Sequence, residues 1–324
     1  MSDALPIIIA HRGASGYLPE HTLAAKALAH AMGANFIEQD VVLSRDGTPI
    51  VLHDIHLDST TDVARCFPDR AREDGRFYAI DFDIQEIRQL RVHERTHIDA
   101  ARQGQAVYPQ RFPAQPGLFG VPTLVEEITL LAGLDHSRGC RTGLYIELKS
   151  PNWHRREGLN ISSAILQVLQ DTGYWNRPDQ VFLQCFDDQT LCQLREAMPI
   201  PLPMIQLIGE NAWGEDSDVD YDYLRTPSGL SYVASYAQGI GPFISHIYQG
   251  KAESGSARLS SLVELAHARG LQVHPYTFRR DELPEGVDSF SELLDIFLQQ
   301  ARVDGLFTDF PDLVQAYLAA LSAA

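Results

Sequence analysis

Short apolar segments recur along the chain, and most of them are separated by stretches with a helical pattern. The eight segments that we expect to be strands are residues 7–13, 36–43, 144–149, 181–186, 203–208, 237–242, 271–278 and 305–310. Strands that alternate with helices form parallel sheets, and eight such strands closed into a ring form a (β/α)8 barrel, the TIM barrel. A doubly wound open sheet is the alternative, but residues 13–16, GASG, match its glycine-rich first turn poorly. We therefore expect an α/β protein with a TIM barrel.

The stretches between these strands carry apolar residues at the helical period. In residues 21–33, Leu23 and Ala27 share one face, and Gly33 is placed to end the helix. Thr123 and Glu126 have the spacing of a capping box at the start of another helix. The expected helices are residues 21–33, 122–133, 160–173, 188–197, 260–270 and 289–302, with a last one that begins at Asp312.

A ninth apolar segment, residues 49–54 (PIVLHD), does not fit the alternation. Only a short link with Asp46-Gly47 separates it from the strand before, and Asp-Gly is a hairpin turn signal. We therefore expect an extra hairpin strand that returns antiparallel, outside the eight. A turn at these two residues would set Asp40 roughly opposite His53.

Two longer stretches also break the pattern. Residues 55–120 carry many charges and scattered Pro and Gly, and residues 209–229 are acidic and rich in turn residues. Each follows a strand, so we expect both on the face of the barrel where active sites form. Residues 1–324 are expected to form a single domain, with residues 55–120 as an inserted small subdomain.

Composition and charge exclude several classes of protein. The chain has 324 residues, of which 44% are hydrophobic, and this is enough for one large core. Its formal net charge of -17 argues against a nucleic-acid partner, because phosphate backbones attract cationic surfaces. The four cysteines include no CxxC pair, so zinc-binding spacing is absent. The sequence leaves the oligomeric state open.

The sequence also bears on the compartment. No run of apolar residues is long enough for a membrane span. The first residues, MSDALPIIIAHRG, have neither a basic start nor a long apolar stretch, so they do not read as a secretory signal. We expect a cytoplasmic protein from the sequence as it stands; a periplasmic protein whose export signal had been removed would look the same.

Polar pairs end several of the expected strands. Side chains two apart on a strand face the same way, so Glu38 and Asp40 point together, and Glu147 and Lys149 repeat the arrangement. The further pairs are Gln184 with Phe186 and His274 with Tyr276. Ion pairs such as Glu38 with Lys149 are the simpler explanation, but inward polar pairs on several strands are hard to explain by packing alone. Three carboxylates, Glu38, Asp40 and Glu147, suit a hard divalent cation, either Mg²⁺ or Ca²⁺.

Basic side chains lie beside these carboxylates in the predicted barrel. His11 ends the first strand and His53 ends the hairpin strand, and two imidazoles beside one cation form an acid/base pair near neutral pH. Arg12 and Lys149 are positioned to contact a phosphate ester, although each could instead form an ion pair. Glu20 is expected to cap the first helix or to support a metal ligand.

With these residues assembled, the chain resembles the glycerophosphodiester phosphodiesterases. The family pattern of HRG, P-E-N-T, I-E-x-D, D-G-x-x-V-x-x-H-D and E-x-K reads here as HRGASGYLPEHTLAA, IEQDVVLSRDGTPIVLHD and YIELK. Segments such as FPDRAREDGRFYAIDF, HPYTFRRDELP and GLFTDFPD are closest to the large bacterial periplasmic type. The resemblance covers essentially the whole chain. One departure from the broad family is His21, which stands where Asn is usual.

The resemblance implies a TIM barrel with an insertion, a metal held by Glu38, Asp40 and Glu147, and a catalytic pair of His11 and His53. Such enzymes hydrolyse glycerophosphodiesters, such as glycerophosphocholine and glycerophosphoethanolamine, to sn-glycerol 3-phosphate and an alcohol.

Our hypothesis for the mechanism takes one histidine as base and the other as acid, with His11 as the base and His53 as the acid in the first assignment. The attacking group is water or the substrate's own glycerol hydroxyl, which would give a cyclic phosphate first. The expected substrate-binding residues are Arg12, Lys149, Gln184, Phe186 and Tyr276. The alcohol headgroup would face the two irregular stretches, with Trp213 and Phe243 as further candidate walls beside Phe186 and Tyr276.

Two other functions compete with this one. A phospholipase-like phosphodiesterase on a related barrel would act on lysophospholipids, and it would require an exposed apolar rim for membrane contact. The sequence has no basic amphipathic helix, which argues against this function. A noncatalytic protein that binds phosphate esters would not need two proton-transfer groups, so the presence of both histidines argues against it.

Overall fold

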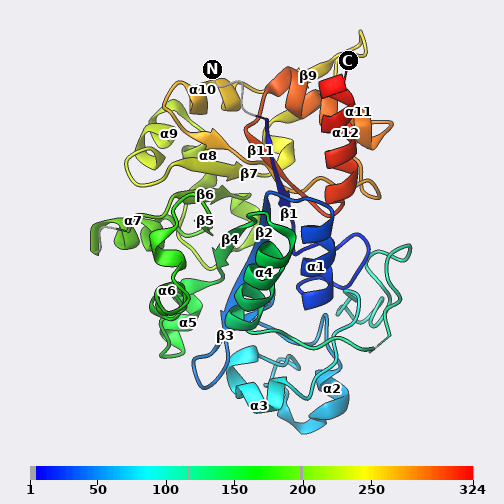
Figure 1. Cartoon of the computed structure of the whole chain (residues 1–324), viewed down its shortest axis with the longest axis vertical. Helices are drawn as coiled ribbons and strands as arrows, with labels where there is room; N and C mark the ends of the chain where they lie inside the picture. Colours follow the sequence, from blue (N-terminus) through cyan, green and yellow to red (C-terminus); the bar gives the residue numbers. More distant parts are fainter. Residues whose placement is uncertain (1–4, 116, 198–199, 324) are drawn as a thin grey trace.

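The computed structural model describes residues 5–115, 117–197 and 200–323, and eight parallel strands in this part of the chain form the centre of the molecule (Figure 1). In chain order they are β1 (Ile7–Ala10), β2 (Phe36–Leu43), β4 (Gly143–Leu148), β5 (Val181–Cys185), β6 (Met204–Ile208), β7 (Gly239–Pro242), β10 (Gln272–Val273) and β11 (Gly305–Thr308). Their order in the sheet is β10-β7-β6-β5-β4-β2-β1-β11. Backbone hydrogen bonds from Asp304 to Val273 (3.1 Å) and from Phe278 to Phe307 (2.8 Å) join the two outer strands. The predicted TIM barrel is therefore confirmed.

The helices that follow most strands pack on the outside of the barrel. They are α1 (Leu23–Ala31), α4 (Leu124–Arg138), α6 (Ile161–Asp171), α7 (Asp188–Ala197), α9 (Pro227–Val233), α10 (Leu262–His267), α11 (Phe290–Asp295), a π-helical turn (Ile296–Ala301) and α12 (Pro311–Ala323). The predicted helices all occur among them, whereas α9 was not predicted. The capping box of α4 forms as expected: Thr123 accepts from the Glu126 amide and Glu126 accepts from the Thr123 amide.

Several shorter elements have too few residues to show a period. They are the helices α2 (Val63–Cys66), α3 (Ile84–Ile87), α5 (Pro151–Arg156) and α8 (Tyr221–Leu224), the 3-10 turns Pro68–Arg70, Ala79–Asp81, Tyr174–Asn176, Asn211–Trp213 and Ile244–His246, and the hairpin of β8 (Tyr248–Lys251) and β9 (Ala257–Leu259). The hairpin was not predicted from the sequence because its strands are short and only partly buried, so neither shows an apolar face.

The extra strand β3 (Pro49–Val51) pairs antiparallel with β2, as predicted, but its register was predicted wrongly. Val41 lies opposite Val51, which sets Leu52 rather than His53 against Asp40, and the Leu52 amide donates to the Asp40 carbonyl at 2.9 Å. The reason is the loop. Ser44 bonds back to Thr48, and Gly47 has a φ of 75°, so the turn holds three residues instead of two.

The segment between β3 and α4 contains residues 55–120, and its first part, with α2 and α3, lies at one end of the molecule (Figure 1, cyan), whereas its later part runs back along the side (Figure 1, teal). It has a buried apolar cluster that includes Phe77, Phe82 and Leu90. The same cluster contains Val42 of β2 and Ile50 of β3. The segment therefore packs directly on the hairpin that extends from the barrel.

The interior of the barrel is closed by a small apolar layer. Ile9, Tyr145, Ile205 and Phe307 are buried together there. Polar side chains of the same strands lie nearer the carboxyl ends, above this floor. No helix in the described ranges is both long and apolar enough to span a membrane.

Candidate active site

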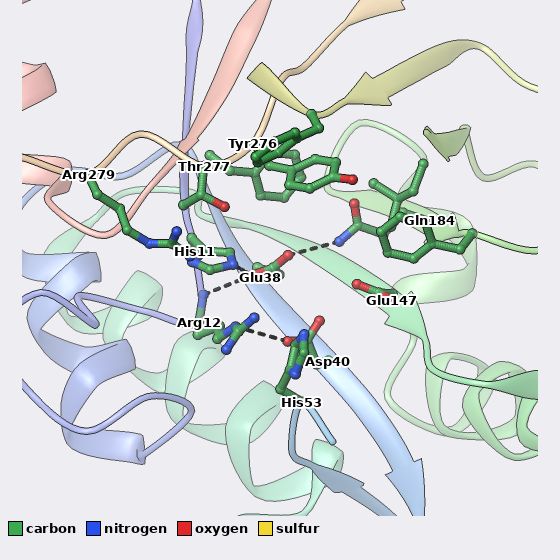
Figure 2. Close-up of a pocket in the computed structure, with 14 residues that line it drawn as sticks. His11, Arg12, Glu38, Asp40, His53, Glu147, Gln184, Tyr276, Thr277 and Arg279 are labelled. Carbon is green, nitrogen blue, oxygen red and sulfur yellow. Dashed lines mark hydrogen bonds and ion pairs between the residues drawn. The ribbon is translucent and has the colours of Figure 1, made fainter. Parts of the chain in front are cut away.

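A cavity of about 150 Å³ opens at the carboxyl ends of the strands (Figure 2). Its lining residues come from strands spread around the barrel, and the polar side chains among them are labelled in Figure 2. The lining residues are His11, Arg12, Glu38, Asp40, His53, Glu147, Gln184, Phe186, Leu207, Phe243, Tyr276, Thr277, Arg279 and Phe307. Nine of the ten side chains that the sequence singled out as catalytic, metal-binding or substrate-binding lie among them, and Lys149 lies against two of the others.

Three carboxylates converge in this cavity. Glu38 and Asp40 project from the same face of β2, and Glu147 lies opposite Asp40 in the pairing of β2 with β4. All three are buried, and each offers an oxygen within 4.8 Å of the oxygens of the other two. Glu38 accepts hydrogen bonds from the Arg12 amide (2.9 Å) and from the Gln184 side chain (3.0 Å) (Figure 2).

The crowding of three acidic groups shifts their ionisation. Burial, with Asp40 nearby, raises the pKa of Glu147 to about 8, and burial and the charge of Asp40 raise the pKa of Glu38 well above its usual value. Asp40 behaves in the opposite way: burial works against its ionisation, but His21, His53 and Lys149 together outweigh burial and hold the pKa of Asp40 well below its ordinary value. The geometry of the site brings three carboxyl groups together, and the raised pKa values of two of them favour protons there.

The donor set fits a hard divalent cation. Asp40 Oδ1 and Gln184 Oε1 are buried and have no hydrogen-bond partner in the described structure. Carboxylate and amide oxygens are the ligands that Mg²⁺ and Ca²⁺ prefer, and neither sulfur nor a histidine belongs to the three-carboxylate group. A cation would also offset the burial and the mutual repulsion that raise the pKa of Glu38 and of Glu147.

His21, the departure from the family pattern, is a neighbour of the carboxylates. Its Nε2 lies 2.8 Å from Asp40 Oδ2, and the side chain is buried. Its backbone has a φ of 60°, and its amide donates to the Arg12 carbonyl at 2.9 Å. Burial lowers the pKa of His21 to about 3, so the neutral ring donates its proton to Asp40 and orients that carboxylate.

His11 is held from behind by a residue that the sequence analysis missed. Its Nδ1 lies 2.6 Å from Asp309 Oδ1, just after β11. Asp309 also accepts from Arg279 and Arg111 at 2.8 Å, which keeps the carboxylate ionised despite its burial. Because an ionised carboxylate can only accept, Nδ1 carries the proton, and Nε2 is left facing the cavity, 3.8 Å from Glu38.

His53 is held in the same way by its own neighbour. Its Nδ1 lies 2.6 Å from Asp54 Oδ1, and Asp54 also accepts from Ser59 (2.7 Å) and Arg95 (2.7 Å). The free Nε2 lies 3.5 Å from the Lys149 ammonium. Although the register of the hairpin differs from the prediction, the chain leaves β3 at Val51, so His53 still lines the cavity.

Both histidines are therefore oriented by a carboxylate and neutral at pH 7. Burial, assisted by the charge of Arg12, lowers the pKa of His11 and that of His53 to about 4. A neutral imidazole with Nδ1 protonated and Nε2 free is the form that accepts a proton. The arrangement thus gives two proton acceptors on two sides of the carboxylate cluster.

The cations at the mouth have carboxylate partners. Arg12 contacts both oxygens of Glu20 at 3.1 Å, and its Nε lies 3.4 Å from Asp40. Lys149 pairs with Glu147 at 2.7 Å, not with Glu38. Thr22, not Glu20, caps α1, so the predicted capping role of Glu20 is wrong. Glu20 instead joins Arg12 to Arg95, whose Nη2 lies 2.6 Å from it.

The remaining predicted side chains form the wall beside the carboxylates. Gln184 comes from β5, Phe186 follows it, and the Tyr276 hydroxyl donates to the Ile208 carbonyl at 3.0 Å. Phe243 also lines this cavity, whereas Trp213 packs edge-on against Phe243 at 5.2 Å and is 44% exposed. Four residues of the site were not predicted from the sequence, namely Asp309, Arg95, Arg111 and Arg279, although the segments HERTH and TFRRDE hold two of the three arginines.

The fold and the site define a barrel enzyme of the phosphodiesterase class. The chain matches the model of the Glycerophosphoryl diester phosphodiesterase family over residues 11–313. It is 39% identical to a glycerophosphodiester phosphodiesterase of Haemophilus influenzae over 94% of this chain and 88% of that protein. The chain belongs to the glycerophosphoryl diester phosphodiesterase family, and the family predicted from the sequence is confirmed.

Solved structures agree in fold. A candidate glycerophosphoryl diester phosphodiesterase from Silicibacter pomeroyi is 26% identical, with a TM-score of 0.72 over 99% of this chain and 95% of that one. An Oleispira antarctica phosphodiesterase, solved in complex with the product sn-glycerol-3-phosphate, is 22% identical, with a TM-score of 0.65 over 97% of each chain. The second likeness bears on the fold alone.

Proposed function

We propose that this enzyme hydrolyses glycerophosphodiesters, such as glycerophosphocholine and glycerophosphoethanolamine, to sn-glycerol 3-phosphate and an alcohol. The observation that carries the proposal is one cavity that joins three buried carboxylates to two histidines, each backed by its own aspartate. Membership of the family supports the reaction class. The Oleispira antarctica protein, which has the same fold, binds sn-glycerol-3-phosphate, and this supports the product.

Glu38, Asp40 and Glu147 would hold one divalent cation, Ca²⁺ or Mg²⁺. Such a cation neutralises negative charge on a phosphate oxygen as the diester reacts. His21 would keep Asp40 oriented toward it, and Gln184 would hold Glu38 through the 3.0 Å hydrogen bond. Arg12, with its buried Nε free of a hydrogen bond, is placed to donate to the phosphate.

The two histidines would divide the proton transfers. One Nε2 takes the proton of the attacking group, which is water or the glycerol hydroxyl. The other histidine first takes up a proton from solvent at its Nε2, and it then gives that proton to the leaving oxygen. Asp309 and Asp54 would stabilise each imidazolium as it forms, because each lies 2.6 Å from the Nδ1 of its histidine. The Lys149 ammonium lies 3.5 Å from His53 Nε2, and its positive charge favours the neutral form of the ring. Once His53 is protonated, the same charge makes it a strong proton donor.

Release of glycerol 3-phosphate from glycerophosphocholine, with and without a chelator, tests the reaction and its cation together. We expect activity that the chelator abolishes and that Ca²⁺ or Mg²⁺ restores. Lysophosphatidylcholine is the comparison substrate, and faster turnover of it would replace this function with the phospholipase-like one. Activity that survives complete metal removal would rule out the cation site.

Replacement of the histidines tests the acid/base scheme. His11→Ala and His53→Ala should each lower kcat by roughly 10²–10⁴-fold, the usual contribution of general acid–base catalysis. His136→Ala, on the exposed surface of α4, is the matched control and should leave kcat unchanged. Near-normal turnover by both active-site variants would contradict the scheme.

A further inference from the structure

A second cavity of about 190 Å³ adjoins the first. The two cavities share His11, Arg12, His53 and Arg279, so the imidazoles stand between them. The three carboxylates line only the first. The second is built largely by the segment between β3 and α4, and its other lining residues are Ser15, Glu20, Glu94, Arg95, Val107, Tyr108, Arg111 and Asp309.

The four guanidinium groups of the second cavity are already paired. Arg12 and Arg95 bind Glu20, and Arg111 and Arg279 bind Asp309. Each of these two wall carboxylates holds two guanidinium groups, and each arginine has a further carboxylate partner outside the wall: Asp40 for Arg12, Asp54 for Arg95, Asp281 for Arg111 and Glu282 for Arg279. The cavity is polar but offers no unbalanced arginine for an anion.

Glu94 is the exception in this paired wall. The residue is 3% exposed, and its Oε2 is buried without a hydrogen-bond partner in the described structure. None of the arginines of the cavity forms an ion pair with it among the described residues. Burial, with the charge of Glu20, raises the pKa of Glu94 to about 8. A buried acceptor left unpaired is costly, so a donor supplied by a ligand would bind there with a clear gain.

Because the histidines lie between the two cavities, each cavity would receive one half of a diester. A phosphate between His11 and His53 would have the carboxylates on the side of the first cavity. One ester arm would extend past Phe186 and Tyr276, and the other would enter the second cavity beside Glu94. The glycerol phosphate half is common to all substrates of the proposed function, and it belongs with the carboxylates that would hold the cation.

We propose that the second cavity is the subsite for the alcohol half of the diester, and that Glu94 is a specificity-determining residue that accepts a hydrogen bond from a hydroxyl or primary ammonium group of that alcohol. The proposal rests on the proposed function. It makes the ethanolamine ester a better substrate than the choline ester, because the quaternary ammonium of choline has no N–H to donate.

The test compares kcat/KM for glycerophosphoethanolamine and glycerophosphocholine, with glycerol 3-phosphate as the common readout. We expect the wild-type enzyme to prefer the ethanolamine ester about tenfold, as for one buried hydrogen bond to a charged group. Glu94→Leu should bring the ratio close to one. Glu94→Gln keeps an acceptor oxygen but cannot ionise when an ammonium group binds, so it should give an intermediate ratio. Glu73→Gln, on an exposed residue of the same segment, should keep the wild-type ratio.

A second variant tests the subsite without changing Glu94, so the proposal can still be tested if the Glu94 variants fail to fold. Val107→Phe narrows the second cavity, so it should lower kcat/KM for glycerophosphoinositol, whose alcohol is large, more than for the ethanolamine ester. A wild-type enzyme without preference, an unchanged ratio in Glu94→Leu, or equal losses in Val107→Phe would each overturn the subsite. Failure of the wild-type enzyme to release glycerol 3-phosphate from any diester would instead overturn the proposed function.

Discussion

At the scale of single residues, the site depends on side chains that hold other side chains. Asp309 and Asp54 orient the two histidines, His21 orients Asp40, and Gln184 holds Glu38. Each of these contacts fixes which atom faces the cavity. Loss of a supporting residue of this kind typically costs roughly 10–100-fold in metal affinity or activity.

His21→Ala should weaken Ca²⁺ or Mg²⁺ binding by roughly 10–100-fold, because Asp40 would lose the donor that orients it and keeps it ionised. Titration of the metal-free enzyme by calorimetry measures the change. His21→Asn, which restores the family's usual residue and retains a donor, should lose less affinity than the alanine variant. Equal affinity in His21→Ala and wild type would remove His21 from the cation site.

Cation binding should release protons at pH 7. In the metal-free enzyme, burial raises the pKa of Glu147 to about 8, so this carboxyl is mostly protonated at pH 7 and must ionise to bind. Burial and the charge of Asp40 raise the pKa of Glu38 as well. Affinity should therefore rise with pH up to about 8 and then level off. Calorimetry in two buffers of different ionisation enthalpy counts the protons. Glu147→Gln should release fewer, and a proton count of zero in the wild type would contradict the linkage.

At the scale of elements, the patterns that the sequence predicted well are local ones. The eight strands, the principal helices and the capping box of α4 follow from periodicity and from signals within a few residues. The hairpin register failed because one added loop residue shifts every pair, and the choice between a two-residue and a three-residue loop is made by Gly47 in its left-handed conformation.

Thr123→Ala should lower the free energy of unfolding by about 1 kcal/mol, because the first turn of α4 would lose a side-chain acceptor for the Glu126 amide. Urea denaturation measures the difference. Thr129→Ala lies within the same helix, where the exposed hydroxyl only bonds to the Val125 carbonyl, and it should be nearly neutral. A loss as large in the control as at the cap would show that the cap is not the cause.

At the scale of the whole molecule, the segment of residues 55–120 and the barrel share a buried cluster. Phe82 lies in the segment and is fully buried with Val42 of β2 and Ile50 of β3. We therefore propose that the chain behaves as a single domain. Phe82→Ala should lower the free energy of unfolding by about 3–5 kcal/mol and shift one cooperative transition. Two separate transitions in calorimetry would instead make the segment an independent unit.

The parts of the site that the sequence did not reveal are contacts between distant elements. The three carboxylates were found because Glu38 and Asp40 lie two apart on one strand and Glu147 ends another. Asp309 follows β11, 298 positions from His11, and no local spacing links the two. The closure of the barrel determines which carboxylate contacts which histidine. Hydrophobic periodicity predicts the strands but not these contacts between them.

The hydrogen bond between His11 and Asp309 has a consequence for the biosynthesis of the enzyme. Asp309 is translated 298 positions after His11, so the imidazole exists long before its partner does. A nascent chain that has not yet received its last strand lacks the carboxylate that orients the imidazole, so we expect it to be inactive even if the earlier strands have already paired. Catalytic competence would thus arrive only once β11 and the aspartate that follows it have been made.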